Sequence, residues 1–238
     1  MSKRPKYHLF QSIFFILLLV TAAYVLARSS VFEVRQIKVV GNYTLTSENI
    51  TAASGINPGE NIFKLDLKAS AQRLQIIPLI KKAELTRKLP AAVEIQIEER
   101  RPRAILPFDG GFIQVDEEGV CLQKGNLGQS PLPVITGVNF TVPAPGGQIK
   151  SQALDKALTV AKGLPGGLLP MLSEIHVEGD LIIIYTLDGI QCRLGTASDA
   201  QQKGEVLMKV LTELKEKGKK IQYIDLSYTG SPVVKYGE

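Results

Sequence analysis

The sequence predicts an α+β protein with a single N-terminal transmembrane helix followed by two mixed domains. Three observations favour this class. Residues 9–27 form an uncharged apolar run, residues 32–103 carry strand and helix signals in the order β-α-α-β-β, and residues 104–238 hold short strands separated by turn residues. We expect a cytoplasmic tail at 1–8, the transmembrane helix at 9–27, a first domain at 32–103 and a second at 104–238.

The composition is that of a folded chain. The 238 residues are 45% hydrophobic and 21% charged, which excludes wholesale disorder. The net charge of +5 depends strongly on the first eight residues, where Lys3, Arg4 and Lys6 have no acidic neighbour. The charge therefore gives little support for a nucleic-acid surface, and we expect no nucleic-acid partner.

The apolar run fits a membrane span. Its nineteen residues form a helix about 28 Å long, close to the ~30 Å hydrocarbon core of a bilayer. Aromatic residues, Tyr7 and Tyr24, lie near both ends, as is common at membrane interfaces. The residues that we assign to the span include Leu9, Phe14, Leu18, Tyr24 and Ala27.

A cleaved signal peptide is the competing interpretation of this run, because residues 25–27 loosely match a small-x-small cleavage site. Apolar cores of signal peptides are about 7–15 residues long, so the greater length favours an anchor. Basic residues lie on both sides of the run, but those of the tail have no compensating acids. This asymmetry favours a cytoplasmic N-terminus, with the rest of the chain outside.

The first domain is predicted element by element. Alternating residues 36–40 form a strand that Gly41 ends, and Thr46 or Ser47 caps a short helix over 48–54. Asp66 caps a second helix with one apolar stripe, which Pro78 ends. Residues 80–86 form a strand, and strict alternation over 93–98 predicts a half-buried one. Pro102 marks the boundary.

The second domain is predicted to be a mixed or antiparallel β domain with flanking helices. Strands at 112–115 and 120–123 form a hairpin, and strands at 174–177, 181–187 and 190–194 form a meander whose second turn contains Asp188-Gly189. Helices are expected over 151–162 and after residue 198, followed by strand 221–228 and an extension at 232–236.

The order and punctuation of the first domain resemble a POTRA domain of the FtsQ/DivIB type, a bacterial cell-division family. The resemblance rests on residues 37–42, 55–56, 59–63, 65–66, 78–83, 87–90 and 98–102. Residues 132–137, 187–189, 193–195 and 224–228 likewise resemble the β domain of that family. Leu79 and Ser227 depart from the family, which often has Trp and Arg at these positions.

The resemblance implies a bitopic membrane scaffold of the septal complex, without enzymatic activity, that binds small coiled-coil partners of the FtsB/DivIC and FtsL type. An exposed strand edge would bind such a partner by adding a strand to the sheet. We place this edge in the last element, at Ile224, Leu226, Tyr228, Thr229, Gly230, Val233, Val234 and Lys235. The sequence leaves open whether Tyr228 contacts a partner or packs onto the core.

The sequence contains no clear catalytic or cofactor signature. It has two histidines, His8 and His176, and no phosphate-binding loop, so we expect no metal, cofactor or small-molecule substrate. Whether Cys121 and Cys192 form a disulfide stays open, although buried free thiols are favoured.

Two alternative functions remain. An anchored cell-wall enzyme would use acids such as Glu98, Asp188 or Asp225 in a cleft. An outer-membrane assembly factor would need repeated POTRA units or a barrel of many ~10-residue strands, and the sequence has neither.

Overall fold

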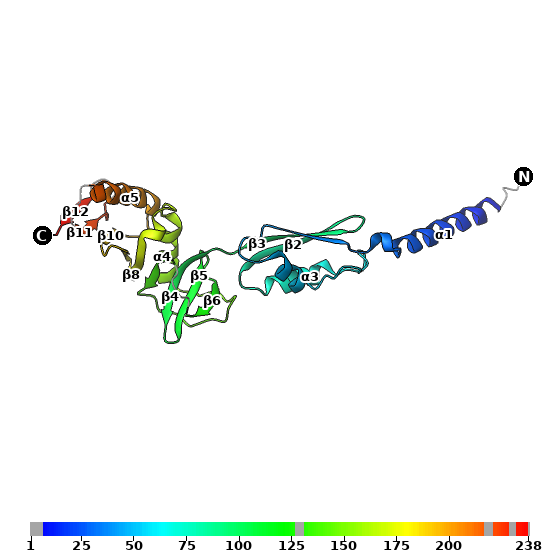
Figure 1. Cartoon of the computed structure of the whole chain (residues 1–238), viewed down its shortest axis with the longest axis horizontal. Coiled ribbons are helices and arrows are strands. Elements are labelled where there is room, and N and C mark those ends of the chain that lie inside the picture. The colour runs from blue at the N-terminus through cyan, green and yellow to red at the C-terminus, as the bar shows by residue number, and fades with distance from the viewer. Residues whose placement is uncertain (1–6, 127–130, 217–220, 229–231, 238) are drawn as a thin grey trace, which may run out of the picture. The chain divides into compact units, whose positions relative to one another are not determined.

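The computed structural model describes residues 7–126, 131–216, 221–228 and 232–237. The chain divides into two compact units, the first at Met1–Glu99 and the second at Arg100–Glu238 (Figure 1). Residues 100–103, which the sequence analysis assigned to the first domain, lie in the second unit. Pro102 begins a strand there because it pairs with Asp116 of the same unit.

The N-terminal helix α1 (Tyr7–Ala27) is apolar on all sides, and its side chains are exposed from Phe10 to Leu26. It is long and apolar enough to cross a membrane. An exposed helix without a polar face has no favourable surroundings in water, so these features fit a single-pass membrane anchor.

The folded part of the first unit has the predicted order. Its elements are η1 (Ser30–Phe32), β1 (Gln36–Val40), α2 (Ser47–Ser54), α3 (Leu67–Gln75), β2 (Ile80–Lys88) and β3 (Ala92–Glu99). Thr46 and Asp66 cap the two α-helices as expected, since their side chains accept hydrogen bonds from backbone amides. The second helix ends at Gln75, before Pro78.

In the three-stranded sheet, β3 lies between β1, to which it is parallel, and β2, to which it is antiparallel. The alternating residues Val93, Ile95 and Ile97 of β3 are buried, as predicted for a half-buried strand. They pack with Ile50 and Leu74 of the two helices in one core. The predicted β-α-α-β-β fold is therefore confirmed.

The carboxylate of Glu99 ties the far end of β3 to the loop that follows β1. It accepts hydrogen bonds from the backbone amides of Tyr43, Thr44 and Leu45 at 3.0, 2.8 and 3.0 Å. Burial opposes ionisation of this carboxyl, but the amides together outweigh burial and hold its pKa below the ordinary value. The ionised form is therefore the one that stabilises the fold.

We predict that the hydrogen bonds of the Glu99 carboxylate make the stability of the first unit depend on pH in the acidic range. Because the folded-state pKa is depressed, the contribution to stability is complete above the ordinary value of 4.5 and is lost as the pH falls through the folded-state pKa. Amide hydrogen exchange of residues 43–45 should accelerate in that range beyond its intrinsic rate. Glu99→Gln should remove most of this dependence, whereas Glu98→Gln, at a side chain that is 59% exposed, should keep it. Equal pH profiles for both variants would contradict the assignment.

The described residues of the second unit form one large sheet and two α-helices. Its strands are β4 (Pro102–Phe108), β5 (Gly111–Asp116), β6 (Cys121–Gly125), β7 (Val134–Thr136), β8 (Leu172–Glu178), β9 (Leu181–Thr186), β10 (Gln191–Gly195), β11 (Ile221–Asp225) and β12 (Val233–Tyr236). Its helices are α4 (Gln152–Gly163), η2 (Leu169–Met171) and α5 (Ala200–Glu216). The described strands pair in the order β12-β11-β10-β9-β8-β7-β4-β5-β6.

This sheet is mixed, as predicted. The pairs β4–β7, β7–β8 and β10–β11 are parallel, and the other neighbours are antiparallel. Leu154 and Leu158 of α4 and Leu207 and Leu211 of α5 join the strands in one buried cluster. The two helices therefore supply the apolar cover that a sheet of this size requires.

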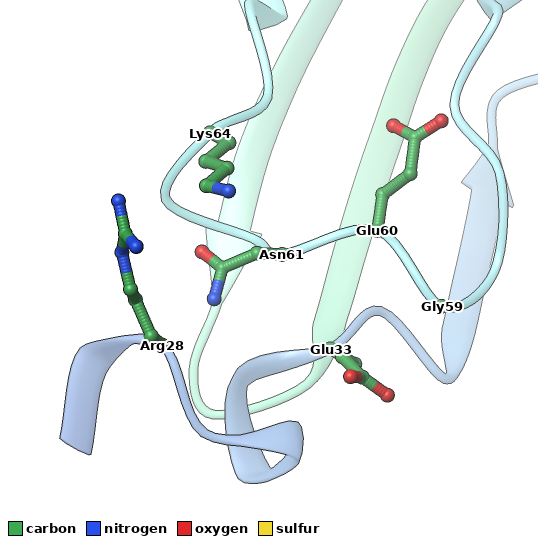
Figure 2. Close-up of a pocket in the computed structure, with 6 residues that line it drawn as sticks. All are labelled: Arg28, Glu33, Gly59, Glu60, Asn61 and Lys64. Atoms are coloured by element: carbon green, nitrogen blue, oxygen red, sulfur yellow. The ribbon is translucent and has the colours of Figure 1, made fainter. Parts of the chain in front are cut away.

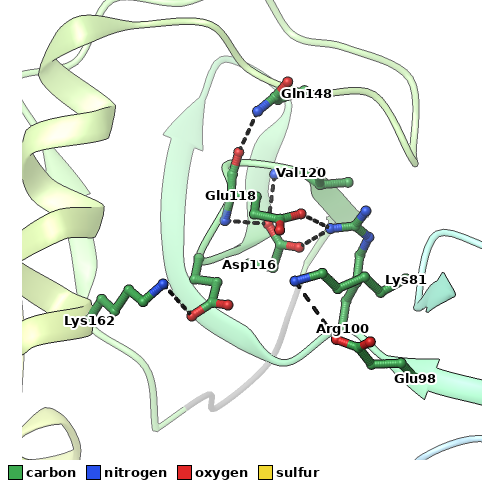
Figure 3. A network of polar contacts seen from close by, with 9 residues as sticks. Lys81, Glu98, Arg100, Asp116, Glu118, Val120, Gln148 and Lys162 are labelled. Atoms are coloured by element: carbon green, nitrogen blue, oxygen red, sulfur yellow. Dashed lines mark hydrogen bonds and ion pairs between the residues drawn. The ribbon is translucent and has the colours of Figure 1, made fainter.

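The start of the second unit is held by an ion pair between a buried aspartate and a partly buried arginine. Asp116, only 2% exposed, accepts hydrogen bonds from the backbone amides of Glu118 and Val120, both at 2.9 Å (Figure 3). Its other carboxylate oxygen lies 2.5 Å from Nη1 of Arg100, which also contacts Glu118 at 2.7 Å. The residues before β4 are thus fixed to the β5–β6 turn.

Candidate binding edge of the second unit

The strand β12 lies at one edge of the nine-stranded sheet and pairs with β11 alone among the described strands. Its sequence, Val-Val-Lys-Tyr, consists mainly of β-favouring residues, and Pro232 precedes it. Figure 1 shows β10, β11 and β12 beside one another near the C-terminus. One side of the β12 backbone is therefore open within the described part of the chain.

The register identifies which backbone groups face this open side. The amide of Leu226 donates to the carbonyl of Arg193 at 2.8 Å, so Ile224 and Leu226 direct their backbone groups toward β10. Tyr223 and Asp225 then face β12, where they pair with Lys235 and Val233. Backbone groups alternate along a strand, so those of Val234 point to the open edge.

The structure separates the predicted edge residues into two groups. Ile224 and Leu226 are 0% and 1% exposed and belong to the core, where their side chains join the cluster that includes α4 and α5. The strand β11, which contains Ile224, is internal, with a neighbour on each side. Tyr228 and Val233 are 82% and 56% exposed. Tyr228 therefore does not pack onto the core, which was one of the two alternatives that the sequence allowed. Val234 is half-buried against the core, and Lys235 is exposed. Thr229 and Gly230 lie outside the described residues.

A charged and aromatic stripe lies beside the edge and was not predicted from the sequence. The guanidinium carbon of Arg193 lies 4.8 Å from the centroid of the Tyr223 ring, and Nζ of Lys235 lies 5.8 Å from the same ring. Strand pairing sets Arg193 beside Asp225 and Asp225 opposite Val233, so these side chains share the face away from the core. The alternation of Tyr223 and Asp225 with buried residues is the sequence signal that could have revealed this face.

The acids of the alternative enzyme hypothesis have separate local roles. Glu98 forms an ion pair with Lys81 at 3.8 Å. Asp225 accepts a hydrogen bond from the amide of Ser227 at 2.9 Å, and Asp188 is an exposed turn residue. In the described ranges, no three acidic, histidine or cysteine side chains gather as they would to hold a metal ion. His176 contacts Thr136 through Nδ1 at 2.7 Å.

Both cysteines are free thiols. Cys121 is in β6 and Cys192 in β10, and five strands lie between them. At ~4.8 Å per strand their separation is roughly 25–30 Å, far beyond the reach of a disulfide. Burial raises the pKa of both thiols, that of Cys192 to about 12, so neither favours the reactive thiolate. Cys121 and Cys192 therefore do not form a disulfide with each other.

Comparison with known protein families gives two matches along the chain. Residues 32–100 match the model of the POTRA domain, FtsQ-type, and residues 104–227 match that of the cell division protein FtsQ/DivIB, C-terminal. Together the two regions cover almost all of the chain after α1.

Individual relatives agree with these matches. The cell division protein FtsQ of Syntrophotalea carbinolica is 32% identical over 90% of this chain and 77% of its own. The cell division protein DivIB of Clostridium botulinum is 26% identical over 97% of this chain and 91% of its own. A solved structure, the major extracytoplasmic domain of the trans isomer of DivIB from Geobacillus stearothermophilus, is 21% identical, with a TM-score of 0.38, over 50% of this chain and 97% of that chain. The family matches and the first of these relatives show that this chain belongs to the FtsQ/DivIB family of cell division proteins.

Proposed function

We propose that this chain is a bitopic scaffold of the cell-division complex at the septum, without enzymatic activity of its own. In this proposal residues 1–8 are cytoplasmic, 9–27 span the membrane, and the domains at 32–103 and 104–238 lie outside. The second unit binds protein partners of the DivIC/FtsB and FtsL type. The observation that carries the proposal is the open backbone edge of β12 in a family of cell division proteins.

The partner would bind by adding a strand beside β12. The N–H and C=O groups of Val234 face the open edge, where a partner backbone can pair with them. Each such hydrogen bond contributes only about 0.5–1.5 kcal/mol net. The four residues of β12 therefore give weak binding by themselves, and side chains must supply the rest.

The exposed side chains beside the edge indicate what the partner carries. Tyr228 and Val233 offer apolar surface, and aromatic residues often dominate the binding energy of interfaces. Arg193 and Lys235 flank Tyr223 and add positive charge. We therefore expect acidic residues next to apolar ones on the partner segment, and an association rate that falls with added salt.

The test is a binding titration of the full-length chain against a purified partner of the DivIC/FtsB type. Val234→Pro removes the outward amide but leaves the β11–β12 hydrogen bonds, and Val233→Lys places a charge on the apolar surface. We expect each change, and Tyr228→Ala, to weaken binding at least about tenfold, as for central interface residues.

Matched controls carry the same changes elsewhere. Leu181→Lys alters a side chain of the internal strand β9 that is 51% exposed, close to the 56% of Val233. Tyr43→Ala alters a tyrosine of the first unit that is 80% exposed, close to the 82% of Tyr228. The β12 proposal would be refuted if the two controls lowered the affinity for the partner as much as the edge variants do. It would also be refuted if all three edge variants kept the original affinity.

A further inference from the structure

A cavity of about 530 Å³ lies where the apolar helix meets the first folded elements. Its lining residues are Arg28, Glu33, Gly59, Glu60, Asn61 and Lys64 (Figure 2). Arg28 is the first residue after α1, so the cavity begins where the apolar segment ends. If α1 spans a bilayer, its end lies at the depth of the lipid headgroups.

The walls of this cavity are attached to the last turn of the helix. Nδ2 of Asn61 donates to the carbonyl oxygen of Ala27 at 2.7 Å, and its Oδ1 accepts from the amide of Phe63 at 3.0 Å. The amide of Val34 donates to the carbonyl of Glu60 at 2.8 Å. The side chain of Asn61 thus holds the loop that forms one wall against the end of the helix, and a backbone bond holds the same loop to Val34.

Two cations line the cavity without an ion-pair partner in the described part of the chain. The guanidinium group of Arg28 packs over the ring of Tyr24, 4.6 Å from its centroid. Figure 2 shows the charged ends of Arg28 and Lys64 on the side of Asn61, with the carboxylates of Glu33 and Glu60 directed away from them. Glu60 is engaged by Asn57 at 2.7 Å. Two exposed cations beside a cavity are suited to a phosphate group.

Exposed apolar side chains surround the same end of the unit. Val31 and Phe63 are each 47% exposed, and Phe63 packs on Phe32 with ring centroids 5.0 Å apart. Leu89, in the turn between β2 and β3, is 60% exposed. The amide of Arg35 donates to the carbonyl of Ala91, which holds this turn at the same end of the unit. Cations next to exposed aromatic and aliphatic side chains are typical of surfaces that rest on a membrane.

We propose that this end of the first unit binds the bilayer in which α1 is anchored, with Arg28 and Lys64 holding a phospholipid phosphate and Phe63 and Val31 in the headgroup layer. The inference rests on the membrane anchor of the proposed function. A basic residue near an anionic bilayer raises the ratio of docked to undocked chains about fivefold. This matters here because the helix keeps the cavity beside the lipids. The contact would fix the orientation of the first unit on the membrane.

The test uses the absence of tryptophan from the sequence. Phe63→Trp places one tryptophan in the proposed contact, and Tyr43→Trp places one beside Glu99, at the opposite end of β3. The full-length variants are inserted into nanodiscs of phosphatidylglycerol with brominated acyl chains, which quench tryptophan. We expect blue-shifted, quenched emission from Phe63→Trp and neither effect from Tyr43→Trp. Val31→Trp serves as a second reporter if Phe63→Trp disturbs the fold.

A second set of variants tests whether the quenching depends on the two cations and on lipid phosphate. In the Phe63→Trp background, Arg28→Gln with Lys64→Gln should lower the ratio of docked to undocked chains roughly 25-fold, about fivefold for each cation. Lys82→Gln, which removes one positive charge near the far end of β3, should have no effect, whereas Lys64→Gln alone should lower the ratio about fivefold. Phe63→Trp in phosphate-free nanodiscs of brominated digalactosyldiacylglycerol should be quenched only as much as the double variant is in phosphatidylglycerol.

Three results would overturn the inference. The first is equal quenching of the Phe63→Trp and Tyr43→Trp reporters, and the second is quenching of Phe63→Trp that persists in the double charge variant. The third is a blue shift of Phe63→Trp emission in galactolipid nanodiscs when inorganic phosphate is added, which would assign the site to soluble phosphate. A chain that fails to enter nanodiscs would instead contradict the membrane anchor, so the two failures are distinguishable by co-elution with lipid.

Discussion

Replacing Asp116 with alanine is expected to destabilise the second unit by about 3–5 kcal/mol, because two backbone amides lose their acceptor and a partly buried ion pair is broken. The carboxylate is 2% exposed, and the change removes the acceptor for two backbone amides and leaves Arg100 without its buried partner. Both cysteines of the chain are buried in this unit, so thiol labelling in increasing urea reports its unfolding specifically.

Glu118→Gln is the matched control for this prediction. Glu118 contacts the same Nη1 atom of Arg100, at 2.7 Å, but its side chain is 41% exposed. An exposed ion pair contributes about 0–1 kcal/mol, so the control should shift the urea midpoint only slightly. Equal shifts for the two variants would show that burial of Asp116 does not determine the strength of this contact.

Gly41→Ala is expected to destabilise the first unit by about 3–5 kcal/mol, by combining backbone strain with overpacking. Gly41 has a φ of +87°, a conformation that residues with a side chain rarely adopt. A Cβ atom there would lie 2.1 Å from the carbonyl oxygen of Ile97 in β3. Since that oxygen belongs to the central strand, the clash cannot be relieved by moving a side chain. Hydrogen exchange of the β3 amides measures the loss.

Gly59 separates the two causes. Its φ is +88°, almost the same as that of Gly41, but a Cβ atom there would have nothing within 4 Å. Gly59→Ala should therefore show strain alone, about 1–2 kcal/mol. If Gly41→Ala costs no more than Gly59→Ala, the close approach to Ile97 is not the dominant cause.

Local patterns predicted most of the elements because they depend on neighbours in sequence. The alternation of Val93, Ile95 and Ile97 placed β3 and its buried face, and the capping residues Thr46 and Asp66 placed the starts of α2 and α3. Periodicity reports which face of an element is buried but not which element covers it. For this reason Ile224 and Leu226 were assigned to a binding edge, although their side chains are buried in the core that the helices cover.

The contacts that organise the candidate sites join distant parts of the sequence. The Arg100–Asp116 pair, the stacking of Arg193 on Tyr223, and the bond from Asn61 to Ala27 each depend on the folded chain. Each residue has an ordinary interpretation when taken alone, as a strand end, a strand residue or a turn. No spacing rule relates such pairs, so they could not be predicted from the sequence.

The sequence by itself determined the apolar N-terminal helix, the β-α-α-β-β order of the first domain and most strands and helices of the second, because hydrophobic period, caps and turn residues act over a few positions. It missed β4, because Pro102 at its start was interpreted as a boundary. The predicted edge included residues of β12, but only the tertiary structure decided that β11 is internal, so that its residues do not belong to that edge, and that Cys121 and Cys192 are far apart. The reason is physical: strand order in a sheet follows from long-range backbone pairing and from how helices cover the sheet, and neither leaves a local signature in the chain.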